Sequence, residues 1–324
     1  PSCPGSECER PTPELGSSTT SYRTSASSST SDGARPEALL GAAAARLRLV
    51  HPFPSLLNGG AVVALALLAG GSVPDAARLG LAMTAIQFSI GALNDVVDAP
   101  RDRGRVPVKP VADGLVSRTW AIAVAVAAAG AGLALTAASG GSALVVAACG
   151  AACGYVYDLR LSRTSWAWPP LSIALPLVPV YAWLGATGSV PTGLVALLPV
   201  GMLAGGGLAV GNALADLTAD MTAGAPSLAI RLGRGAAWRV HALALGGAVV
   251  LAVAFLPADP PPASVALFIG GLVVLAGGVA ALALAPSPSK FAVARVGWQA
   301  EALGIALIGV GWVLALSTSL SVAV

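Results

Sequence analysis

Nine long apolar runs, separated by short breaks, occupy the chain from residue 36 onward. Most of them are long enough to cross the ~30 Å hydrocarbon core of a bilayer as a helix. Only 10% of the 324 residues are charged and the mean hydropathy is +0.79, whereas soluble domains carry about 25% charged residues. The sequence therefore predicts an all-α membrane protein. Its nine expected transmembrane helices cover residues 55–71, 76–97, 119–138, 142–157, 166–186, 192–214, 236–256, 263–285 and 291–317.

Positive charge alternates along the breaks between these runs. Of the 18 Lys and Arg residues, 17 lie in the N-terminal region or in every second break, and Arg78 alone lies in the other set. Cytoplasmic loops of membrane proteins carry an excess of Lys and Arg. We therefore expect a multi-pass protein of a bacterial plasma membrane, with its N-terminus in the cytoplasm and its C-terminus outside.

The N-terminal segment differs in composition from the rest of the chain. Residues 1–36 are rich in Ser, Thr and Pro and hold almost no large apolar residues. Such a segment cannot bury enough apolar surface to offset its ordering entropy, so we expect a disordered tail. Residues 37–50 are expected to form a short amphipathic helix, which leads into a single transmembrane domain over 37–324.

One polar pattern, Asn-x-x-x-Asp-x-x-x-Asp, occurs twice at the ends of apolar runs. The copies lie 118 residues apart: Asn94, Asp98 and Asp102, then Asn212, Asp216 and Asp220. On a helix, residues four apart lie one turn apart along the same face. We call the two sets the first row and the second row. Each is expected to present one amide and two carboxylates, which are oxygen ligands that suit Mg²⁺.

Two facing rows of this kind can hold a polyphosphate between bridging metal ions. Ionisable groups at membrane depth are costly and usually functional. Solvated loop charges or helix caps would explain one aspartate but not two matched copies. Asp95 belongs to the first string of residues but points off the face of its row. Five basic residues nearby are candidates for binding the remaining phosphate oxygens: Arg105, Lys109, Arg160, Arg163 and Arg231.

Four segments are similar to the UbiA superfamily of intramembrane prenyltransferases. NDVVDAPRDRGRVPVKPVADGLVS (94–117) resembles its first aspartate-rich motif, including a basic residue, Pro and Gly at Lys109, Pro110 and Gly114. NALADLTADMTAGAPSLAIRLG (212–233) resembles its second aspartate-rich motif. HPFPSLLNGG (51–60) resembles the start of the first crossing, and YDLRLSRTSWAWPPL (157–171) resembles the loop between the fourth and fifth crossings.

The resemblance implies a helical bundle around a central cavity that opens to the cytoplasmic side and to lipid. It implies that the two rows bind two Mg²⁺ ions and a prenyl diphosphate, with Asp98, Asp102, Asp216 and Asp220 as the catalytic carboxylates. Lys109, Tyr157, Arg160 and Arg163 match basic and tyrosine positions near the diphosphate. Asp158 stands where the family often has Ser, Pro or Asn.

The implied reaction is transfer of a prenyl group to a hydrophobic or aromatic acceptor, which the sequence does not identify. A terpene cyclase and a polyprenyl-phosphate phosphoribosyltransferase would use the same site, and both stay open. A transporter would need charges deep inside the crossings, where only Glu301 and Gln299 come close. Trp166, Trp168, Tyr181 and Trp183 either line the acceptor pocket or anchor the chain at the membrane interface. No nucleic-acid partner is expected.

Overall fold

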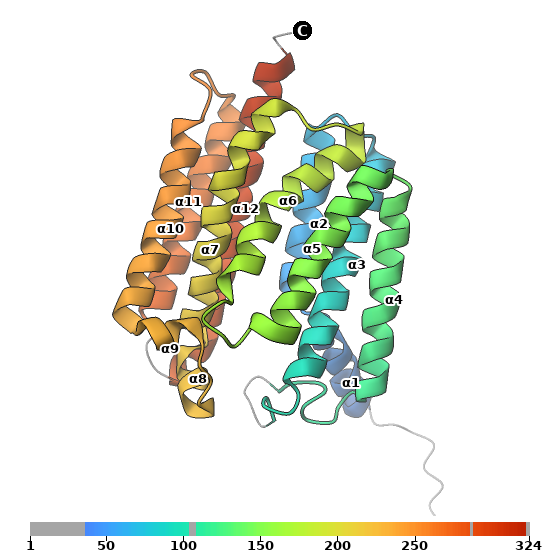
Figure 1. Cartoon of the computed structure of the whole chain (residues 1–324), viewed down its shortest axis with the longest axis vertical. Helices are drawn as coiled ribbons and strands as arrows, with labels where there is room; N and C mark the ends of the chain where they lie inside the picture. The colour runs from blue at the N-terminus through green and yellow to red at the C-terminus, as the bar shows by residue number, and fades with distance from the viewer. Residues whose placement is uncertain (1–35, 104–107, 286–287, 322–324) are drawn as a thin grey trace, which may run out of the picture.

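The computed structural model describes residues 36–103, 108–285 and 288–321, which form a bundle of helices (Figure 1). Residues 1–35, which hold nearly all of the expected tail, lie outside this part. The helices are α1 (Pro36–Leu49), α2 (Pro52–Leu68), α3 (Val73–Asp98), α4 (Arg118–Ala137), α5 (Gly141–Val156), α6 (Trp168–Thr187), α7 (Leu197–Ala215), α8 (Leu217–Ala223), α9 (Leu228–Leu232), α10 (Arg234–Ala254), α11 (Pro262–Ala283) and α12 (Phe291–Ser321).

The expected transmembrane helices are found. Within the described ranges, eight helices are long and apolar enough to cross a membrane, and a ninth candidate exists if α1 and α2 count as one bent span. Residues 43–49 and α2 meet at an angle of 57°. His51 lies at this bend with a positive φ of 47°, and Pro52 then starts α2. A proline suits the first turn of a helix, because its missing N–H would be unpaired there.

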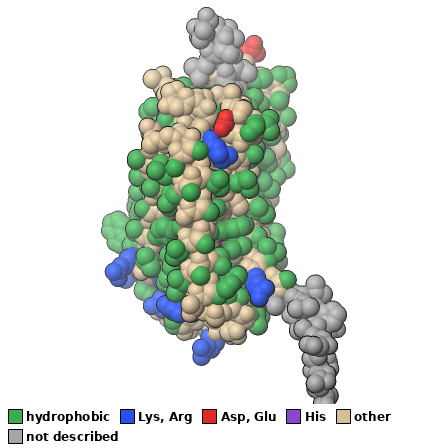
Figure 2. Space-filling model, turned by 90° about the vertical axis from the view of Figure 1, so that its right-hand side faces the viewer, with side chains coloured by type: hydrophobic (Ala, Val, Ile, Leu, Met, Phe, Trp, Pro, Cys, Tyr) green, Lys and Arg blue, Asp and Glu red, His purple; other side chains and the backbone are tan. Residues whose placement is uncertain are grey.

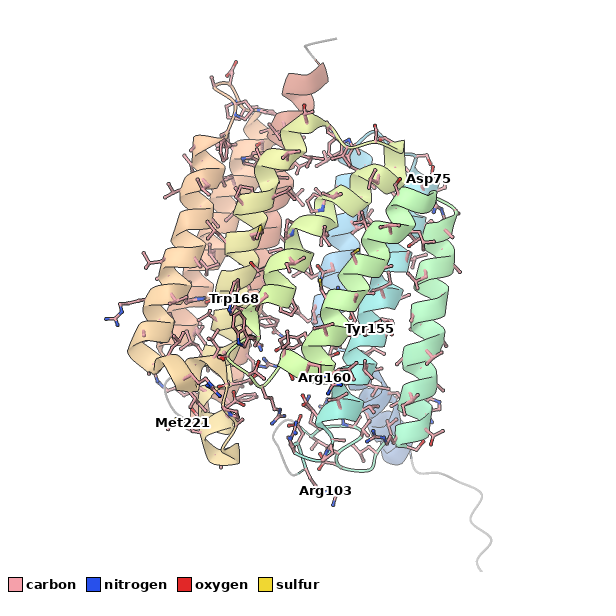
Figure 3. The ribbon with its side chains drawn as sticks, in the orientation of Figure 1. Asp75, Arg103, Tyr155, Arg160, Trp168 and Met221 are labelled. Carbon is pink, nitrogen blue, oxygen red and sulfur yellow. The ribbon has the colours of Figure 1, made fainter. Side chains whose placement is uncertain are left out.

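The two ends of the bundle differ. The N-terminal helix α1 lies at the same end as α8 and α9, whereas the C-terminal part of α12 lies at the opposite end (Figure 1). Arg103 and Arg160 lie at the first of these ends and Asp75 at the second (Figure 3). On the face shown in Figure 2, Lys and Arg side chains gather mainly toward the first end. The basic loops therefore share one end of the molecule.

Buried polar side chains join helices inside the bundle. Tyr181 of α6 is hydrogen-bonded to Thr136 of α4, with 2.9 Å between their hydroxyl oxygens. The indole N–H of Trp312 on α12 donates to the Ala252 carbonyl of α10 at 2.9 Å. Since lipid offers no hydrogen-bond partners, such groups have to be satisfied within the protein. These bonds fix the lateral order of helices that otherwise pack through apolar side chains.

Helices α11 and α12 make their closest approach at four glycines. A Cβ added at Gly278 would lie 2.6 Å from the Gly297 carbonyl oxygen, and one added at Gly271 would lie 2.8 Å from the Gly304 carbonyl oxygen. Such distances are too short for any side chain. Small residues allow backbones to come this close in a membrane, where packing drives helix association.

Candidate active site

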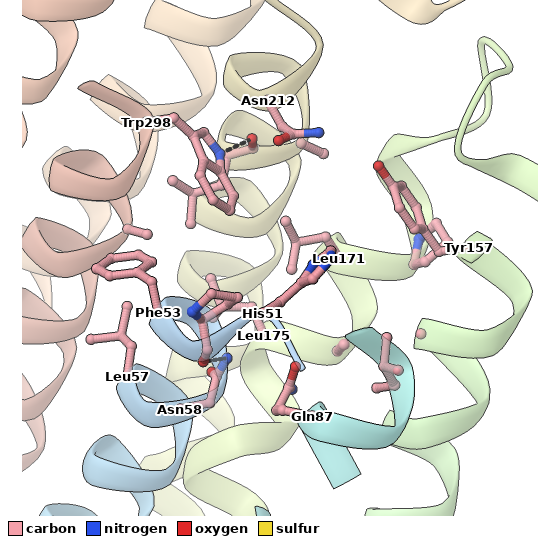
Figure 4. A pocket seen from close by; sticks show the side chains of 18 of the residues that line it. His51, Phe53, Leu57, Asn58, Gln87, Tyr157, Leu171, Leu175, Asn212 and Trp298 are labelled. Carbon is pink, nitrogen blue, oxygen red and sulfur yellow. Dashed lines mark hydrogen bonds between the residues drawn. The ribbon is translucent and has the colours of Figure 1, made fainter. Parts of the chain in front are cut away.

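All six residues of the two rows line one cavity, which has a volume of about 1230 Å³. Most of its wall is apolar and comes from α2, α3, α5, α6, α7 and α12, with smaller contributions from α1, α8, α9 and α10. Figure 4 shows Asn212 and Tyr157 toward one end of the pocket and Asn58 and Gln87 toward the other. The cavity therefore combines a polar end, where the rows lie, with a mostly apolar lining that also includes the amides of Asn58 and Gln87.

The first row begins on α3 and continues beyond the end of that helix. Asn94 and Asp98 belong to α3, which ends at Asp98. Pro100 has no N–H to donate to the Val96 carbonyl, so the regular helix cannot continue. The Arg118 guanidinium lies 3.5 Å from that carbonyl oxygen instead. The Asp102 N–H still donates to the Asp98 carbonyl at 3.1 Å, which keeps the next aspartate in line.

The second row crosses a break between two helices. Asn212 lies on α7, Asp216 lies between α7 and α8, and Asp220 lies on α8. The Asp216 N–H donates to the Asn212 carbonyl at 3.0 Å, and the Asp220 N–H donates to the Asp216 carbonyl at 2.9 Å. Neither row therefore lies on one uninterrupted helix. The four-residue hydrogen bonds nevertheless preserve the alignment that the spacing predicted.

Arg163 bridges the two carboxylates of the first row. Its Nε lies 3.2 Å from Asp98 Oδ1 and its Nη2 lies 2.9 Å from Asp102 Oδ1. Burial lowers the pKa of the guanidinium, but the two carboxylates outweigh this effect, and the net shift is upward. Arg163 therefore remains a cation at the acidic end of the cavity.

Lys109 and Asp95 tie the following loop to the first row. The Lys109 ammonium lies 3.6 Å from Asp102 Oδ2 and 3.5 Å from Asp95 Oδ1. Asp95 is buried and also accepts a hydrogen bond of 3.0 Å from the Val111 N–H. Asp95 also lines the cavity, and its contacts hold the loop that carries Lys109.

Arg295 is a cavity residue that sequence reasoning missed. It lies on α12, where its Nη1 donates to Asn212 Oδ1 at 2.9 Å and lies 3.7 Å from Asp216 Oδ2. The guanidinium also packs over the rings of Phe291 and Trp298. No local motif marks this arginine, because it is 83 residues away from Asn212 in the chain.

The remaining predicted site residues fall into two groups. Tyr157 lines the cavity and is close enough to Asp98 and Asp216 to interact electrostatically with both. Arg160 and Arg231 are exposed and do not line the cavity. Arg105 lies outside the described residues.

The structure also locates the aromatic residues and Glu301 that the sequence analysis named. Trp166 and Trp168 are exposed rather than cavity-lining, and Trp183 is buried outside the lining, whereas Tyr181 lines the cavity. Glu301 is a paired structural group. It is fully buried and its Oε1 lies 3.2 Å from Nε2 of His241, which is also fully buried.

The donor set of the rows fits Mg²⁺ only if other oxygen atoms complete it. Within the described part of the chain, no group of three or more His, Cys, Asp and Glu side chains is arranged to hold a metal ion. Mg²⁺ usually takes one or two protein carboxylates and fills its octahedron with waters and substrate phosphates. Two carboxylates and an amide in each row match that habit, with a phosphate-bearing ligand as the missing partner.

Several solved structures share this fold. A UbiA homologue from Archaeoglobus fulgidus bound to DMAPP and Mg²⁺ aligns over 82% of this chain and 99% of its own, with 20% identity and a TM-score of 0.55. The apo structure of a UbiA homologue from Aeropyrum pernix K1 aligns over 85% and 99%, with 18% identity and a TM-score of 0.61.

A structure of digeranylgeranylglyceryl phosphate synthase aligns over 86% of this chain and 99% of its own, with 14% identity and a TM-score of 0.60. No curated protein matches the sequence significantly. The sequence model of the UbiA prenyltransferase family matches residues 58–293, which include both acidic rows and most of the transmembrane bundle. The chain therefore belongs to the UbiA prenyltransferase family.

Proposed function

We propose that this protein transfers a prenyl group from a prenyl diphosphate to a lipophilic or aromatic acceptor, in a reaction that depends on Mg²⁺. One observation carries the proposal: two rows of amide and carboxylate oxygens line the same, mostly apolar cavity. The polar end suits a metal-bound diphosphate and the apolar interior suits an isoprenoid chain. The A. fulgidus homologue bound to DMAPP and Mg²⁺ supports this assignment.

The two rows supply the metal ligands in this proposal. One ion would be held by each row, through Asn94, Asp98 and Asp102 or through Asn212, Asp216 and Asp220. When bound, the ions neutralise negative charge that accumulates on the departing diphosphate. Asp98, Asp102, Asp216 and Asp220 are the proposed catalytic carboxylates, because they would hold these ions beside the bond that breaks.

Three cations of the chain complete the polar end. Arg163 and Lys109 contact the first row, and Arg295 contacts the second. Each stands beside carboxylates that would share their charge with a metal ion, and each can then donate hydrogen bonds to phosphate oxygens. Such charge-assisted bonds are strong and favour the leaving group as it gains charge. Tyr157 offers a further hydroxyl between the rows.

The bond changes follow from this placement. The allylic C–O bond breaks and its electron pair leaves with the diphosphate. A nucleophilic atom of the acceptor then forms a bond to the allylic carbon, and the acceptor loses a proton to the released diphosphate. The mostly apolar lining keeps water from the carbocation-like centre, since water would otherwise compete with the acceptor.

We also propose that the polar end of the cavity faces the cytoplasm. The basic loops share the end of the bundle where α1, α8 and α9 lie, and positive loops are retained on the cytoplasmic side. In a variant whose four native cysteines are replaced by serine, Met221→Cys, at an exposed position, is then expected to react with a membrane-impermeant maleimide only in inverted vesicles. Labelling in right-side-out vesicles would contradict this orientation.

The activity test uses the purified protein in lipid nanodiscs with a panel of prenyl diphosphates and a membrane lipid extract as acceptor. We expect prenylated product with Mg²⁺ and none with EDTA. Asp98→Ala and Asp216→Ala are each expected to lower turnover on the order of 10²–10³-fold. Asp259→Ala, in the exposed connection between α10 and α11, is the matched control. Near-normal turnover of the Asp98→Ala/Asp216→Ala double variant would refute the assignment.

The same assay separates the other reactions that this site could support. A cyclised hydrocarbon formed from the prenyl diphosphate without any acceptor would identify a terpene cyclase. Product formed only with phosphoribosyl diphosphate and a polyprenyl phosphate would identify a phosphoribosyltransferase. Prenylated acceptor that requires a prenyl diphosphate supports the proposed transfer.

A further inference from the structure

Asp158 lies beside the first row but belongs to neither row. It follows Tyr157 in a short π-helical segment (Tyr157–Leu161) at the end of α5. Asp158 lines the cavity, and only 3% of its surface is exposed. Its Oδ1 accepts a hydrogen bond of 3.0 Å from Asn94 Nδ2. Its Oδ2 is buried and has no hydrogen-bond partner among the described residues. Burying a carboxylate with one oxygen that makes no hydrogen bond costs free energy, so a functional role would explain why Asp158 is kept there.

The π-helical turn explains how Asp158 reaches Asn94. The Ser162 N–H donates to the Tyr157 carbonyl at 2.8 Å, a hydrogen bond that spans five residues instead of four. The wider turn places the consecutive residues Tyr157 and Asp158 on the cavity wall. Turns of this type are rare in proteins and are frequent at functional sites.

The contacts of Asn94 determine how its side-chain amide is oriented. Nδ2 donates to Asp158 Oδ1 at 3.0 Å and lies 3.4 Å from Asp98 Oδ2. Both partners are carboxylate oxygens, and an ionised carboxylate can accept hydrogen bonds but cannot donate them. The NH₂ group must therefore face them, and the amide oxygen is left on the other side of the group.

We propose that Asp158 is a positioning residue that holds the Asn94 amide so that its oxygen is presented to a divalent cation bound by the first row. This inference rests on the proposed function, since it assumes that the rows bind Mg²⁺. Removing a residue that orients a metal ligand typically weakens metal affinity by roughly 10–100-fold. Asp158 makes the hydrogen bond that such a role requires.

Among the described residues, the second row has a different contact at the corresponding asparagine. There the Asn212 oxygen accepts a hydrogen bond from Arg295. Its amide is therefore held from the oxygen side by a cation and not from the nitrogen side by a carboxylate. The proposal accordingly concerns the first row alone.

The test measures divalent-ion binding directly, by electron paramagnetic resonance of Mn²⁺ displaced by Mg²⁺, in nanodiscs without any prenyl substrate. We expect Asp158→Ala to weaken binding by roughly 10–100-fold. Asp158→Asn keeps an oxygen that accepts the Asn94 N–H, so we expect binding within about 3-fold of the unmodified protein. Asp259→Ala again serves as the control and should leave binding unchanged.

A second pair of variants tests whether Asp158 acts through Asn94. In an Asn94→Ala background, Asp158→Ala should cause no further loss of binding. The reciprocal exchange, Asn94→Asp with Asp158→Asn, restores one donor facing one acceptor, so it should bind more tightly than Asn94→Asp alone. This exchange keeps the proposal testable even if Asp158→Ala does not fold.

The outcomes of these measurements distinguish failure of the inference about Asp158 from failure of the proposed function. Equal losses in Asp158→Asn and Asp158→Ala would show a role for charge instead of orientation and would overturn the inference. So would an additional loss in the Asn94→Ala background, or a lower melting temperature with unchanged ion affinity. Absence of ion binding by the unmodified protein would instead refute the proposed function.

Discussion

The first acidic row is secured by the loop that follows it and by Arg163 from the segment after α5, whereas at the second row an arginine from α12 takes the corresponding place. Lys109 and Asp95 attach the loop after α3, and Arg163 comes from the segment after α5. Arg295 reaches the second row from α12. Equal spacing in sequence therefore does not mean equal support, and the two rows should respond differently to mutation.

The largest expected difference concerns the arginines. Arg163 contacts both carboxylates of its row, so Arg163→Ala should lower kcat/KM by about 100-fold, because two charge-assisted hydrogen bonds are lost. Arg163→Lys keeps the charge but cannot reproduce the planar fork, and should lose about 10-fold. Steady-state kinetics with Arg239→Ala, an exposed position on α10, as control will measure this. A loss below about 3-fold in Arg163→Ala would contradict the comparison.

The backbone behind the second row should be less tolerant of added volume. A Cβ at Gly211 would lie 2.8 Å from Glu301 Oε2 and 2.8 Å from His241 Cε1. Gly211→Ala should therefore destabilise the protein by about 1–3 kcal/mol, although alanine favours helices. The residue at the same offset in the first row is Leu93, which shows that the restriction is specific to the second row.

Thermal unfolding in detergent measures this effect. Gly206→Ala on the same helix is the matched control, because a Cβ there would make an ordinary contact of 3.6 Å with Ser172 Oγ. Equal melting temperatures of the two alanine variants would show that α7 is free to shift away from the buried His241–Glu301 pair.

The loop anchor of the first row has no counterpart in the second. Ala213 occupies the place that corresponds to Asp95. Asp95→Ala leaves the Val111 N–H without its acceptor and should cost about 1–2 kcal/mol, with faster tryptic cleavage at Arg103 or Arg118. Asp95→Asn retains an acceptor oxygen and should be cleaved more slowly than Asp95→Ala. If the two variants are cleaved at the same rate, the hydrogen bond to Val111 does not hold the loop.

The smallest expected effect concerns Arg295. Its side chain is 38% exposed and lies 3.7 Å from Asp216, so Arg295→Ala should reduce kcat/KM by only about 10-fold, or ~1.4 kcal/mol. Lys290→Ala, an exposed position just before α12, is the control in the same kinetic assay. A loss as large as that of Arg163→Ala would mean that both rows depend equally on their arginines.

Much of the fold was predictable from sequence because apolar length determines which segments can span a bilayer. The nine predicted runs correspond to helices, and the bounds differ mainly where polar caps or prolines end them. The predicted run 76–97 ends within one residue of α3, and Pro100 gives the physical reason for that end. The predicted run 192–214 likewise ends within one residue of α7, but the short helix α8 that follows Asp216 was not predicted.

The candidate site was predictable where chemistry repeats at a fixed spacing and not where distant helices meet. The two rows were found because their pattern recurs 118 residues apart. Arg295 was not found, since its approach to Asn212 depends on how α12 packs against α7. Arg160 and Arg231 illustrate the opposite case, because nearness in sequence to a motif did not bring their side chains to the cavity. Asp158 stood out only as a departure from the family pattern.

The glycine contacts between α11 and α12 have a consequence for the site. Gly271 and Gly278 are seven residues apart, as are Gly297 and Gly304. A shift of α12 by one helical turn would bring larger residues against positions that accept none, so the two helices are locked in a single register. Arg295 lies two residues before Gly297 on α12, so its position along the bundle is fixed by the same register. The depth at which the Arg295 cation enters the cavity is thus set by glycines, whose hydrogen atoms stand in place of side chains where α12 packs against α11.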